Sequence, residues 1–219
     1  KSDVKDFLTG GVKLNLSYVI RGGHRVYADA AYVADAPRFN QAFVSPRTRN
    51  SIVPDLKTSK TFAADLNYAY SNSGYDVRVT GYYTTIKDQS KVMSFYDDAQ
   101  NSFTNFAMSG MDERHVGVEL GFKVPLPVPN LSLQGVLSYG QYVYTSNPVM
   151  YQTYDNSAAI VEETYGVTIP YWKSHPTAEG KTVKHYVSGT PQLATSLGLA
   201  WNKNYWFVDA DVDWFDKAY

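Results

Sequence analysis

Apolar and polar residues alternate with a period of two in eight stretches of this 219-residue chain. In the first stretch the apolar positions are Val12, Leu14, Leu16, Tyr18 and Ile20. Successive side chains of a β-strand point to opposite sides, so each stretch would have one apolar and one polar face. The pattern predicts strands at residues 11–21, 25–34, 60–70, 75–87, 113–124, 131–145, 188–201 and 205–215.

The joins between these strands alternate in length. Gly, Asn or Pro residues typical of tight turns occur in the short joins, at 21–24, 71–74, 125–130 and 202–204. The long joins, at 35–59, 88–112 and 146–187, are polar, although Lys91–Tyr96 and Phe103–Met108 have the pattern of short strands. Short turns at one rim and long loops at the other are typical of membrane β-barrels. The chain is therefore predicted to be all-β, one antiparallel up-and-down transmembrane β-barrel domain over residues 1–219.

The apolar faces carry no charged residue, as expected where a strand faces lipid. Each face consists of every second residue, counted from the first, of 12–20, 26–32, 62–70, 77–83, 116–124, 131–139, 193–201 and 206–214. Aromatic residues lie near both ends of them: Trp206 and Trp214 are about 26 Å apart along a strand at ~3.3 Å per residue. With a tilt of about 40° this separation projects to roughly 20 Å, close to the ~25 Å apolar band of such barrels.

The order of short and long joins also predicts direction. Short turns belong on the periplasmic side, so both ends of the chain are expected at the outer rim. Complete bacterial barrels begin and end in the periplasm, and the eight strands are therefore predicted to be an arc of a larger barrel. Two alternatives are a complete small eight-stranded outer-membrane barrel with a structural or adhesive role, and a soluble all-β binding module with charged outer faces.

The amino-acid composition argues against several classes of function. A net charge of −1 without a basic patch argues against nucleic acid as a partner. The absence of cysteine excludes disulfides and thiolate chemistry. No apolar run reaches the roughly 18–20 residues of a membrane helix. The start, Lys1 to Gly10, lacks the charged and apolar regions of a signal peptide, which we expect to have been removed or to lie outside this sequence.

Charged residues on the polar faces are the main candidates for chemistry. Asp209, Asp211 and Asp213 share one face and could form a cation site, but hydrogen bonding to water or to a lumen plug is favoured. The same lumen-wall role, with pairing among themselves or with the plug, is expected for Arg25, Asp29, Asp65, Asp76 and Arg78. A charged barrel lumen is wet and needs no further explanation.

Neither a metal site nor a catalytic site is predicted. Glu113 and His115 of Glu113-Arg114-His115 share a face, whereas His24, His175 and His185 are isolated, and metal sites usually need three or four converging ligands. Ser188-Gly189-Thr190 has no partnered His–Asp pattern, so no enzyme, catalytic residue or cofactor is expected. Potential ligand contacts in the longest loop, for which local packing is at least an equal explanation, are Tyr151, Tyr154, Tyr165, Tyr171 and Trp172.

Four ordered segments resemble the barrel of TonB-dependent outer-membrane receptors, particularly those of the Bacteroidota. Asp35-Ala36-Pro37-Arg38-Phe39 is similar to an Arg-Ala-Pro-type loop entrance, with Asp35 where Arg is usual. Pro54 to Lys60 is similar to an Asn-Pro-x-Leu-Lys-Pro-Glu-x segment, from which Val53, Thr58 and Ser59 depart. Gly81 to Asp88 resembles a strand that ends in a basic–acidic pair. Asn105–Gly110 followed by His115–Glu119 is similar to the family's "N…G…GvE" segment.

The resemblance implies a barrel of about 22 strands that encloses a plug. It further implies import of a large scarce ligand across the cell outer membrane, with energy delivered through TonB. The expected partners are outer-membrane lipid, the plug domain of the same protein, the periplasmic TonB complex and an extracellular ligand. Neither the plug nor the TonB-contacting segment is in this sequence, and the residues do not name the ligand.

Overall fold

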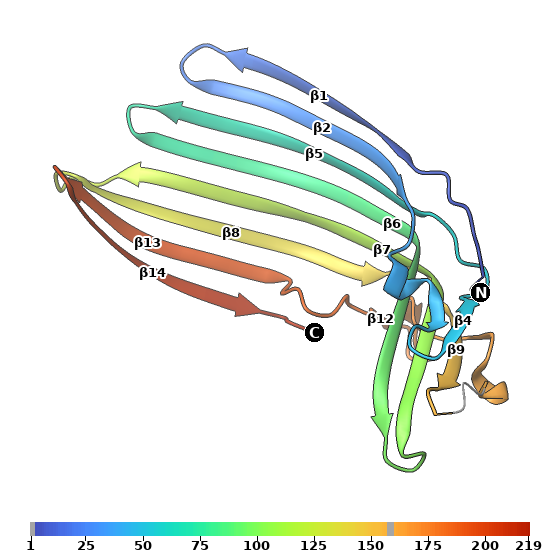
Figure 1. Ribbon diagram of the computed structural model, residues 1–219. Helices are drawn as coiled ribbons and strands as arrows, with labels where there is room; N and C mark the ends of the chain where they lie inside the picture. The colour runs from blue at the N-terminus through green and yellow to red at the C-terminus, as the bar shows by residue number, and fades with distance from the viewer. Residues whose placement is uncertain (1–2, 157–159) are drawn as a thin grey trace.

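The computed structural model describes residues 3–156 and 160–219, and its main feature is one antiparallel β-sheet (Figure 1). Eight long strands follow one another across this sheet in the order β1-β2-β5-β6-β7-β8-β13-β14. Each strand pairs with the next one in this order, as in an up-and-down meander. The all-β antiparallel prediction is confirmed.

The eight predicted strands are all present, with small changes at their ends. Their bounds are β1 Gly10–Ile20, β2 His24–Asp35, β5 Ser59–Asn72, β6 Tyr75–Asp97, β7 Ser102–Pro125, β8 Leu131–Tyr144, β13 Leu193–Lys203 and β14 Trp206–Asp216. The predicted start of the seventh strand at residue 188 was wrong, because β13 begins at Leu193, after a turn in which Gly189 has a φ of 83°. Ser188-Gly189-Thr190 therefore lies in a loop.

The short strands expected at 91–96 and 103–108 are confirmed, and the join at 88–112 is a loop only in part, because β6 and β7 continue through most of it as one hairpin. The segments 91–96 and 103–108 are continuations of these strands and pair with each other. The pairing register shifts between Ile86 and Lys91, where Asp88 has a φ of 58°. Irregularities of this kind bend a strand, and Figure 1 shows the hairpin turning away from the sheet at this level.

Smaller elements pack beside the end of this hairpin. The short strands are β3 Phe43–Ser45, β4 Arg49–Ile52, β9 Val149–Tyr154, β10 Val167–Thr168, β11 His175–Pro176 and β12 Thr182–Val183. Two single 3₁₀ turns, η1 Phe39–Gln41 and η2 Glu162–Thr164, are the only helical elements among the described residues. No helix in the described part of the chain has the length and apolar character needed to cross a membrane.

We call residues 36–58, 89–111 and 146–187, as far as they are described, the loop platform. Here β9 pairs with the distal part of β7, and the β3–β4 hairpin packs beside both strands. Both hydrophobic clusters of the described residues are centred here: Val44, Val53, Leu56, Ala107 and Tyr151 form one, and Met108, Met111 and Tyr144 form the other. The platform has its own interior.

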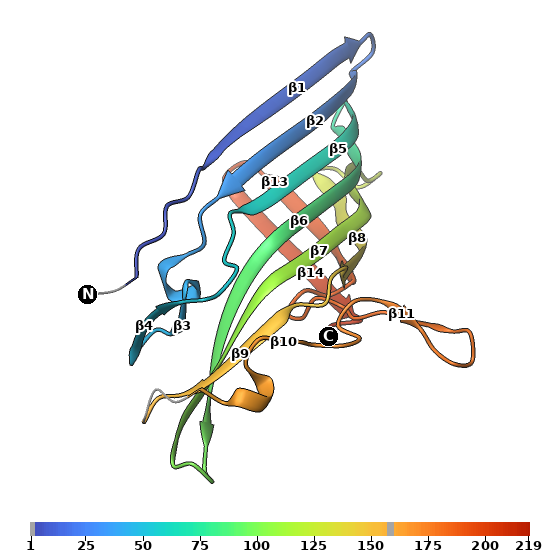
Figure 2. The same cartoon turned by 90° about the vertical axis from the view of Figure 1, so that its right-hand side faces the viewer.

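The sheet is curved and open. Figure 2 shows β13 and β14 lying behind β5 and β6, so that the strands follow an arc. β1 and β14 are its two edges and do not pair with each other in the described structure, so the eight strands do not form the closed small barrel of the alternative hypothesis. The four short turns lie at one end of the sheet, the turn end, and both chain termini lie towards the other, the loop end (Figure 1). The predicted direction of the strands agrees with this arrangement.

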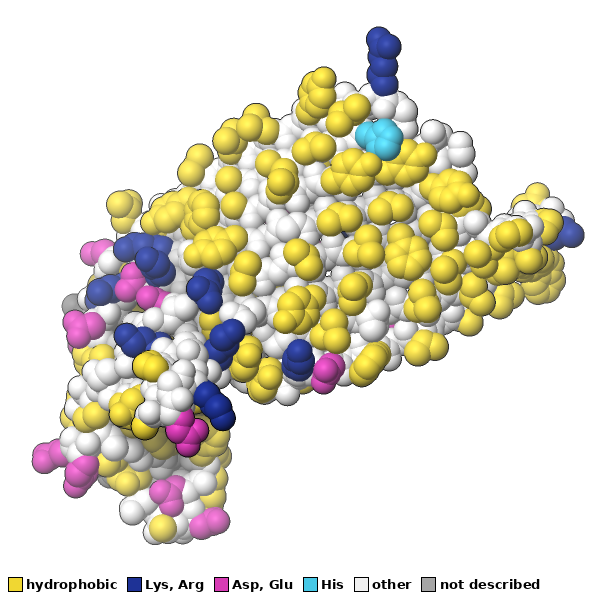
Figure 3. Space-filling model, turned by 180° about the vertical axis from the view of Figure 1, so that it is seen from behind, with side chains coloured by type: hydrophobic (Ala, Val, Ile, Leu, Met, Phe, Trp, Pro, Cys, Tyr) yellow, Lys and Arg dark blue, Asp and Glu magenta, His cyan; other side chains and the backbone are white. Residues whose placement is uncertain are grey.

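One register relates the faces of the first seven strands of the sheet. Leu16 is opposite Ala28, Ala28 opposite Leu66, and Leu66 opposite Gly81. The same row continues through Val118, Tyr139 and Leu193. Every residue of this row lies on the face predicted to be apolar, and Figure 3 shows that face covered with hydrophobic side chains and without charge across its central part.

Candidate functional site on the polar face

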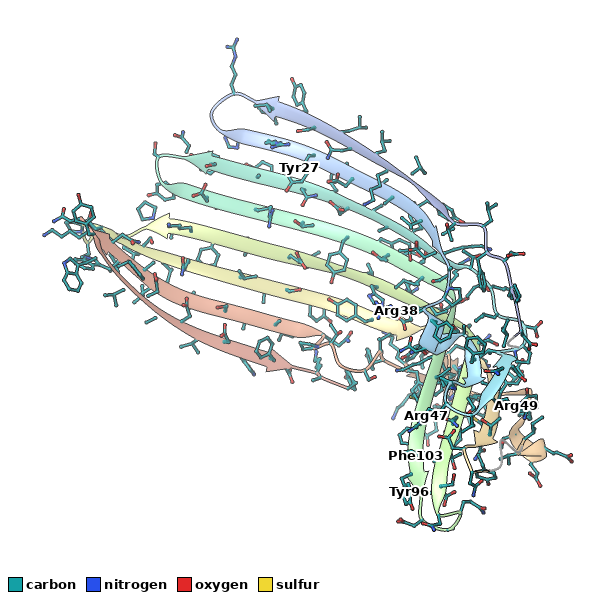
Figure 4. The ribbon with its side chains drawn as sticks, in the orientation of Figure 1. Tyr27, Arg38, Arg47, Arg49, Tyr96 and Phe103 are labelled. Atoms are coloured by element: carbon teal, nitrogen blue, oxygen red, sulfur yellow. The ribbon has the colours of Figure 1, made fainter. Side chains whose placement is uncertain are left out.

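The opposite, polar face is a network of hydrogen bonds between neighbouring strands. Asn15 Nδ2 donates to Asp29 Oδ1 at 2.6 Å, and Arg25 Nε donates to Ser17 Oγ at 2.8 Å. Asn67 links Asp65 to Thr80: its amide donates to the Asp65 carboxylate, and it accepts a 2.6 Å bond from Thr80. The Arg25 guanidinium lies 5.1 Å from the ring centre of Tyr27, which Figure 4 labels among the side chains of the sheet.

The charged residues predicted for the lumen wall therefore bond mainly to neutral neighbours. Asp76 accepts from Ser71, as Asp29 and Asp65 accept from amides. Among the described residues, no salt bridge joins any two of Arg25, Asp29, Asp65, Asp76 and Arg78. The polar character of this wall was predicted correctly, whereas its partners are uncharged groups that alternation could not identify.

Two tyrosines cross the centre of the polar face. The hydroxyls of Tyr82 and Tyr142 are 2.6 Å apart, and the rings lie over the directly paired Gly117 and Gly140. A Cβ at Gly140 would come within 2.5 Å of the Tyr142 hydroxyl and 2.7 Å of the Tyr82 hydroxyl. Glycine is therefore required at Gly140 because aromatic rings occupy the space of a side chain.

Glu113 and His115, predicted to share a face, are in contact. Glu113 Oε2 is 3.1 Å from His115 Nε2, and the imidazole lies against Tyr142. The other three histidines lie beside aromatic rings: His24 by Tyr68 and Tyr70, His175 by Tyr171, and His185 by Trp172. No group of three or more potential metal ligands occurs in the described residues.

The three aspartates of β14 lie opposite small residues of β13. Asp209, Asp211 and Asp213 pair in register with Ala200, Gly198 and Ser196. The Asp211 carboxylate lies over Gly198 and accepts a long bond of 3.4 Å from Gln134 Nε2. Sequence periodicity placed the three residues on one face correctly. Their proposed role in binding water or a plug stays a prediction.

A cavity of about 430 Å³ opens where the polar face meets the loop platform. Its polar groups include Arg38, Gln89, Lys91 and the carboxylate of Glu113, and Met111 and Tyr144 contribute apolar surface. Figure 4 shows Arg38 at this junction. The Gln89 Nε2 atom is buried and has no hydrogen-bond partner among the described residues. Two cations and a free amide donor suit a ligand with oxygen acceptors.

The chain matches a family model. The matched family is described as "TonB dependent receptor-like, beta-barrel", and the match covers residues 5–219. The chain belongs to this family. None of the curated proteins matches its sequence. Among solved structures, the fold is similar to that of a "Copper transporter OprC", with a TM-score of 0.54 and 16% identity over 93% of this chain. The match covers 26% of that protein, so the chain spans about a quarter of its length.

The family barrel explains the shape of the described sheet. An open arc with one apolar and one polar face is what a segment of a large barrel wall would show. The resemblance drawn from four sequence segments is confirmed at the level of the receptor family. The expectations about the Bacteroidota and the plug remain predictions.

Aromatic residues of the loop platform divide into packed and exposed groups. Tyr151 and Tyr165 pack edge to face at 5.0 Å, and Trp172 packs on Tyr144 at 5.2 Å. Tyr171, by contrast, is 66% exposed. Of the five aromatic residues predicted as possible ligand contacts, four make ring contacts within the platform or with Tyr144: Tyr151, Tyr165, Tyr171 and Trp172.

Sequence analysis missed two rings at the tip of the β6–β7 hairpin. Tyr96 and Phe103 lie 5.3 Å apart near that tip, and the Arg47 guanidinium covers Phe103 at 4.3 Å (Figure 4). Both rings belong to the extensions of β6 and β7. The pairing of Tyr96 with Phe103 could have been deduced if residues 88–112 had been treated as one continuous hairpin.

Asp155 holds three loops of the platform together. Its carboxylate accepts bonds from Ser45 at 2.9 Å and Asn105 at 2.6 Å, and it pairs with Arg47 at 3.1 Å. Ser45 and Asn105 are fully buried. A charge-assisted network of this kind fixes these three segments to one another, because the buried donors share one carboxylate acceptor and Asn105 also donates to Ser45.

Proposed function

We propose that this chain forms part of the barrel wall of a TonB-dependent active importer in the cell outer membrane. The apolar face would contact lipid, and the polar face would line the lumen around a plug. A large scarce ligand would bind at the loop end, and TonB acting on the plug would open a path along the polar wall. Membership of the receptor family is the observation that carries this proposal.

The structure supports the proposal through the contrast between the two faces. Leu14, Leu197 and Val212 are at least half exposed although they lie in regular strands. Exposed apolar surface of this extent marks a contact with lipid or with a protein partner. The polar wall opposite them, with its hydrogen bonds between neutral and acidic groups, suits a wet lumen.

Ligand entry is proposed at the 430 Å³ cavity between the polar face and the platform. Arg38 and Lys91 would attract anionic or oxygen-rich groups, and the buried Gln89 amide would donate a directional bond. The cavity holds one group of a ligand, so the rest of a large molecule would extend towards Tyr96 and Phe103. The solved structure with a similar fold is a copper transporter, but no metal-ligand cluster in the described residues favours copper here.

Cysteine labelling in intact cells tests the placement. This chain has no cysteine, so a full-length protein in which any other cysteine is replaced can carry Gln100→Cys at the hairpin tip or Ser73→Cys in a short turn. A membrane-impermeant maleimide should label Gln100→Cys in intact cells and label Ser73→Cys only after lysis. Equal labelling of both positions in intact cells would contradict the proposed topology.

The importer itself is tested in the full-length gene and cell. The gene should encode a plug and a TonB-contacting segment before these strands, and their absence would exclude the importer while leaving the barrel. Purified full-length protein with Arg38→Ala and Lys91→Ala should keep the labelling pattern. This variant should no longer bind the ligand that is recovered with the purified wild-type protein.

A further inference from the structure

A band of basic side chains crosses the apolar face at the loop end. Lys60, Lys87 and Arg114 have the same strand parity as the apolar residues, and Figure 3 shows basic side chains gathered where the sheet meets the platform. Below them lie Tyr32, Phe62 and Tyr83. These six residues and four others line a hollow of about 850 Å³.

Two lysines of this hollow are direct cross-strand neighbours. Lys60 of β5 pairs in register with Lys87 of β6. Side chains in such a pair have Cβ atoms about 5 Å apart, and like charges there are destabilising. Asp88 offsets one of the charges, since its carboxylate lies 3.6 Å from Lys60 and 3.7 Å from Lys57.

The other carboxylates at the hollow are engaged. Glu113 contacts His115, and Asp112 accepts a bond from the Asp88 backbone N–H. Among the described residues, Lys87 has no salt-bridge partner. The cluster of Lys57, Lys60, Lys87 and Arg114 has four positive charges against the three negative charges of Asp88, Asp112 and Glu113, so one positive charge is in excess.

Arg114 adds a free donor. Its Nη2 makes one long bond of 3.5 Å to Gln141, whereas its Nε is buried and has no hydrogen-bond partner in the described part of the chain. A buried guanidinium N–H without an acceptor is costly, and guanidinium groups bind phosphate oxygens with two parallel bonds. An anion with several acceptor oxygens would provide the acceptor for this donor.

We propose that this hollow binds the phosphorylated headgroup of an anionic lipid in the membrane leaflet at the loop end. Lys60, Lys87 and Arg114 contact the phosphate, and the rings of Tyr32, Phe62 and Tyr83 lie along the acyl chains below it. Charge complementarity fixes the occupant's headgroup, and the apolar floor distinguishes a lipid from free phosphate. This inference rests on the proposed placement of the apolar face in a membrane, and concerns its outer surface instead of its lumen.

Native mass spectrometry of the delipidated full-length protein with added lipid A provides the test. The double variant Lys87→Gln/Arg114→Gln should bind lipid A about 25-fold more weakly, because each basic residue near a lipid surface contributes roughly fivefold. Binding to wild type should also fall as the salt concentration rises. The matched control is Arg21→Gln/Lys203→Gln, which removes two basic residues at the turn end and should bind as wild type does.

Two further measurements distinguish a lipid phosphate from free inorganic phosphate. Lipid A from which the phosphates have been removed should bind as weakly to wild type as intact lipid A binds to the double variant. Displacement of lipid A by equimolar inorganic phosphate would overturn the assignment to a lipid, as would undiminished binding to the double variant. Retained heat-modifiable mobility of each variant on gels confirms that it is folded. The cysteine-labelling pattern reports separately on the membrane placement, so failure of the two proposals can be distinguished.

Discussion

The loop platform and the sheet bury their apolar residues in opposite ways. In the platform Leu56, Val44 and Val53 are at most 1% exposed and pack around Tyr151, as in a water-soluble protein. In the sheet Leu16 is 63% and Val118 is 54% exposed, although both belong to well-paired strands. One region supplies its own apolar environment, and the other depends on an environment outside the chain.

This difference separates the two sources of stability. Apolar burial stabilises by roughly 25 cal/mol per Å² removed from water, and within the chain only the platform collects this contribution in full. The sheet holds its strands by backbone pairing in one continuous register. Its apolar face would be removed from water by lipid. Substitutions of the same kind should therefore have different effects in the two regions.

The largest expected difference is between Leu56→Ala and Leu16→Ala. Leu56→Ala creates a cavity in the platform core and should lower its unfolding free energy by about 2–5 kcal/mol. Leu16→Ala leaves no cavity within the described chain because its side chain is exposed. Limited proteolysis in urea of full-length protein in vesicles should show earlier cleavage of the platform only in Leu56→Ala. Equal sensitivity of both variants would show that the platform has no independent core.

The next effect tests the sheet face itself. Val118→Arg puts a charge on the apolar face and should lower the free energy of unfolding in bilayers by about 2–4 kcal/mol. Glu119→Arg is the matched control, since it lies one residue along β7 at almost the same depth and faces the polar side. Urea titration of vesicle-inserted protein measures both. Comparable losses for the two variants would contradict the assignment of the faces.

The same contrast explains what the sequence could predict. Period-two alternation identified all eight spanning strands and their faces, because lipid and lumen impose a regular pattern on every residue. It also indicated the strand segments at 91–96 and 103–108, but not the bend of this hairpin or the packing of Val92, Ala107 and Met108 in the platform. Irregular packing leaves no periodic signal.

The candidate sites follow this rule too. The positions of Asp209, Asp211 and Asp213 and the contact of Glu113 with His115 follow from strand parity. The cavity of Arg38, Gln89 and Lys91 does not, because it joins segments about 50 residues apart through a bulge and a 3₁₀ turn. The pairing of Lys60 with Lys87 could have been found by extending the parity of the apolar faces to the strand ends.

A smaller effect is expected within the polar face. Gly140→Ala places a Cβ against the rings of Tyr142 and Tyr82 and should lower the unfolding free energy by about 1–3 kcal/mol, as overpacking does. Gly121→Ala, on the same face, meets no atom within 4 Å and should have little effect. Chemical unfolding followed by tryptophan fluorescence compares the two. Combining Gly140→Ala with Tyr142→Ala should restore part of the loss, and a lack of recovery would place the strain in the backbone.

The smallest effect concerns the platform at high pH. Burial raises the pKa of Tyr151 above the ordinary value of 10.0, and an opposing contact with Ser109 lowers it by less. Folding thus favours the neutral phenol, so this contribution to stability is complete below pH 10.0 and is lost as the pH rises through the folded-state pKa. Protease cleavage of the platform in wild type should therefore increase at alkaline pH. Tyr151→Phe keeps the ring but cannot ionise, and its cleavage should depend less steeply on pH over this range. Tyr151→Phe should leave the pH dependence of cleavage in the sheet unchanged, because this residue packs within the platform's core. An unchanged alkaline profile in Tyr151→Phe would exclude this phenol as the group that limits the platform's stability.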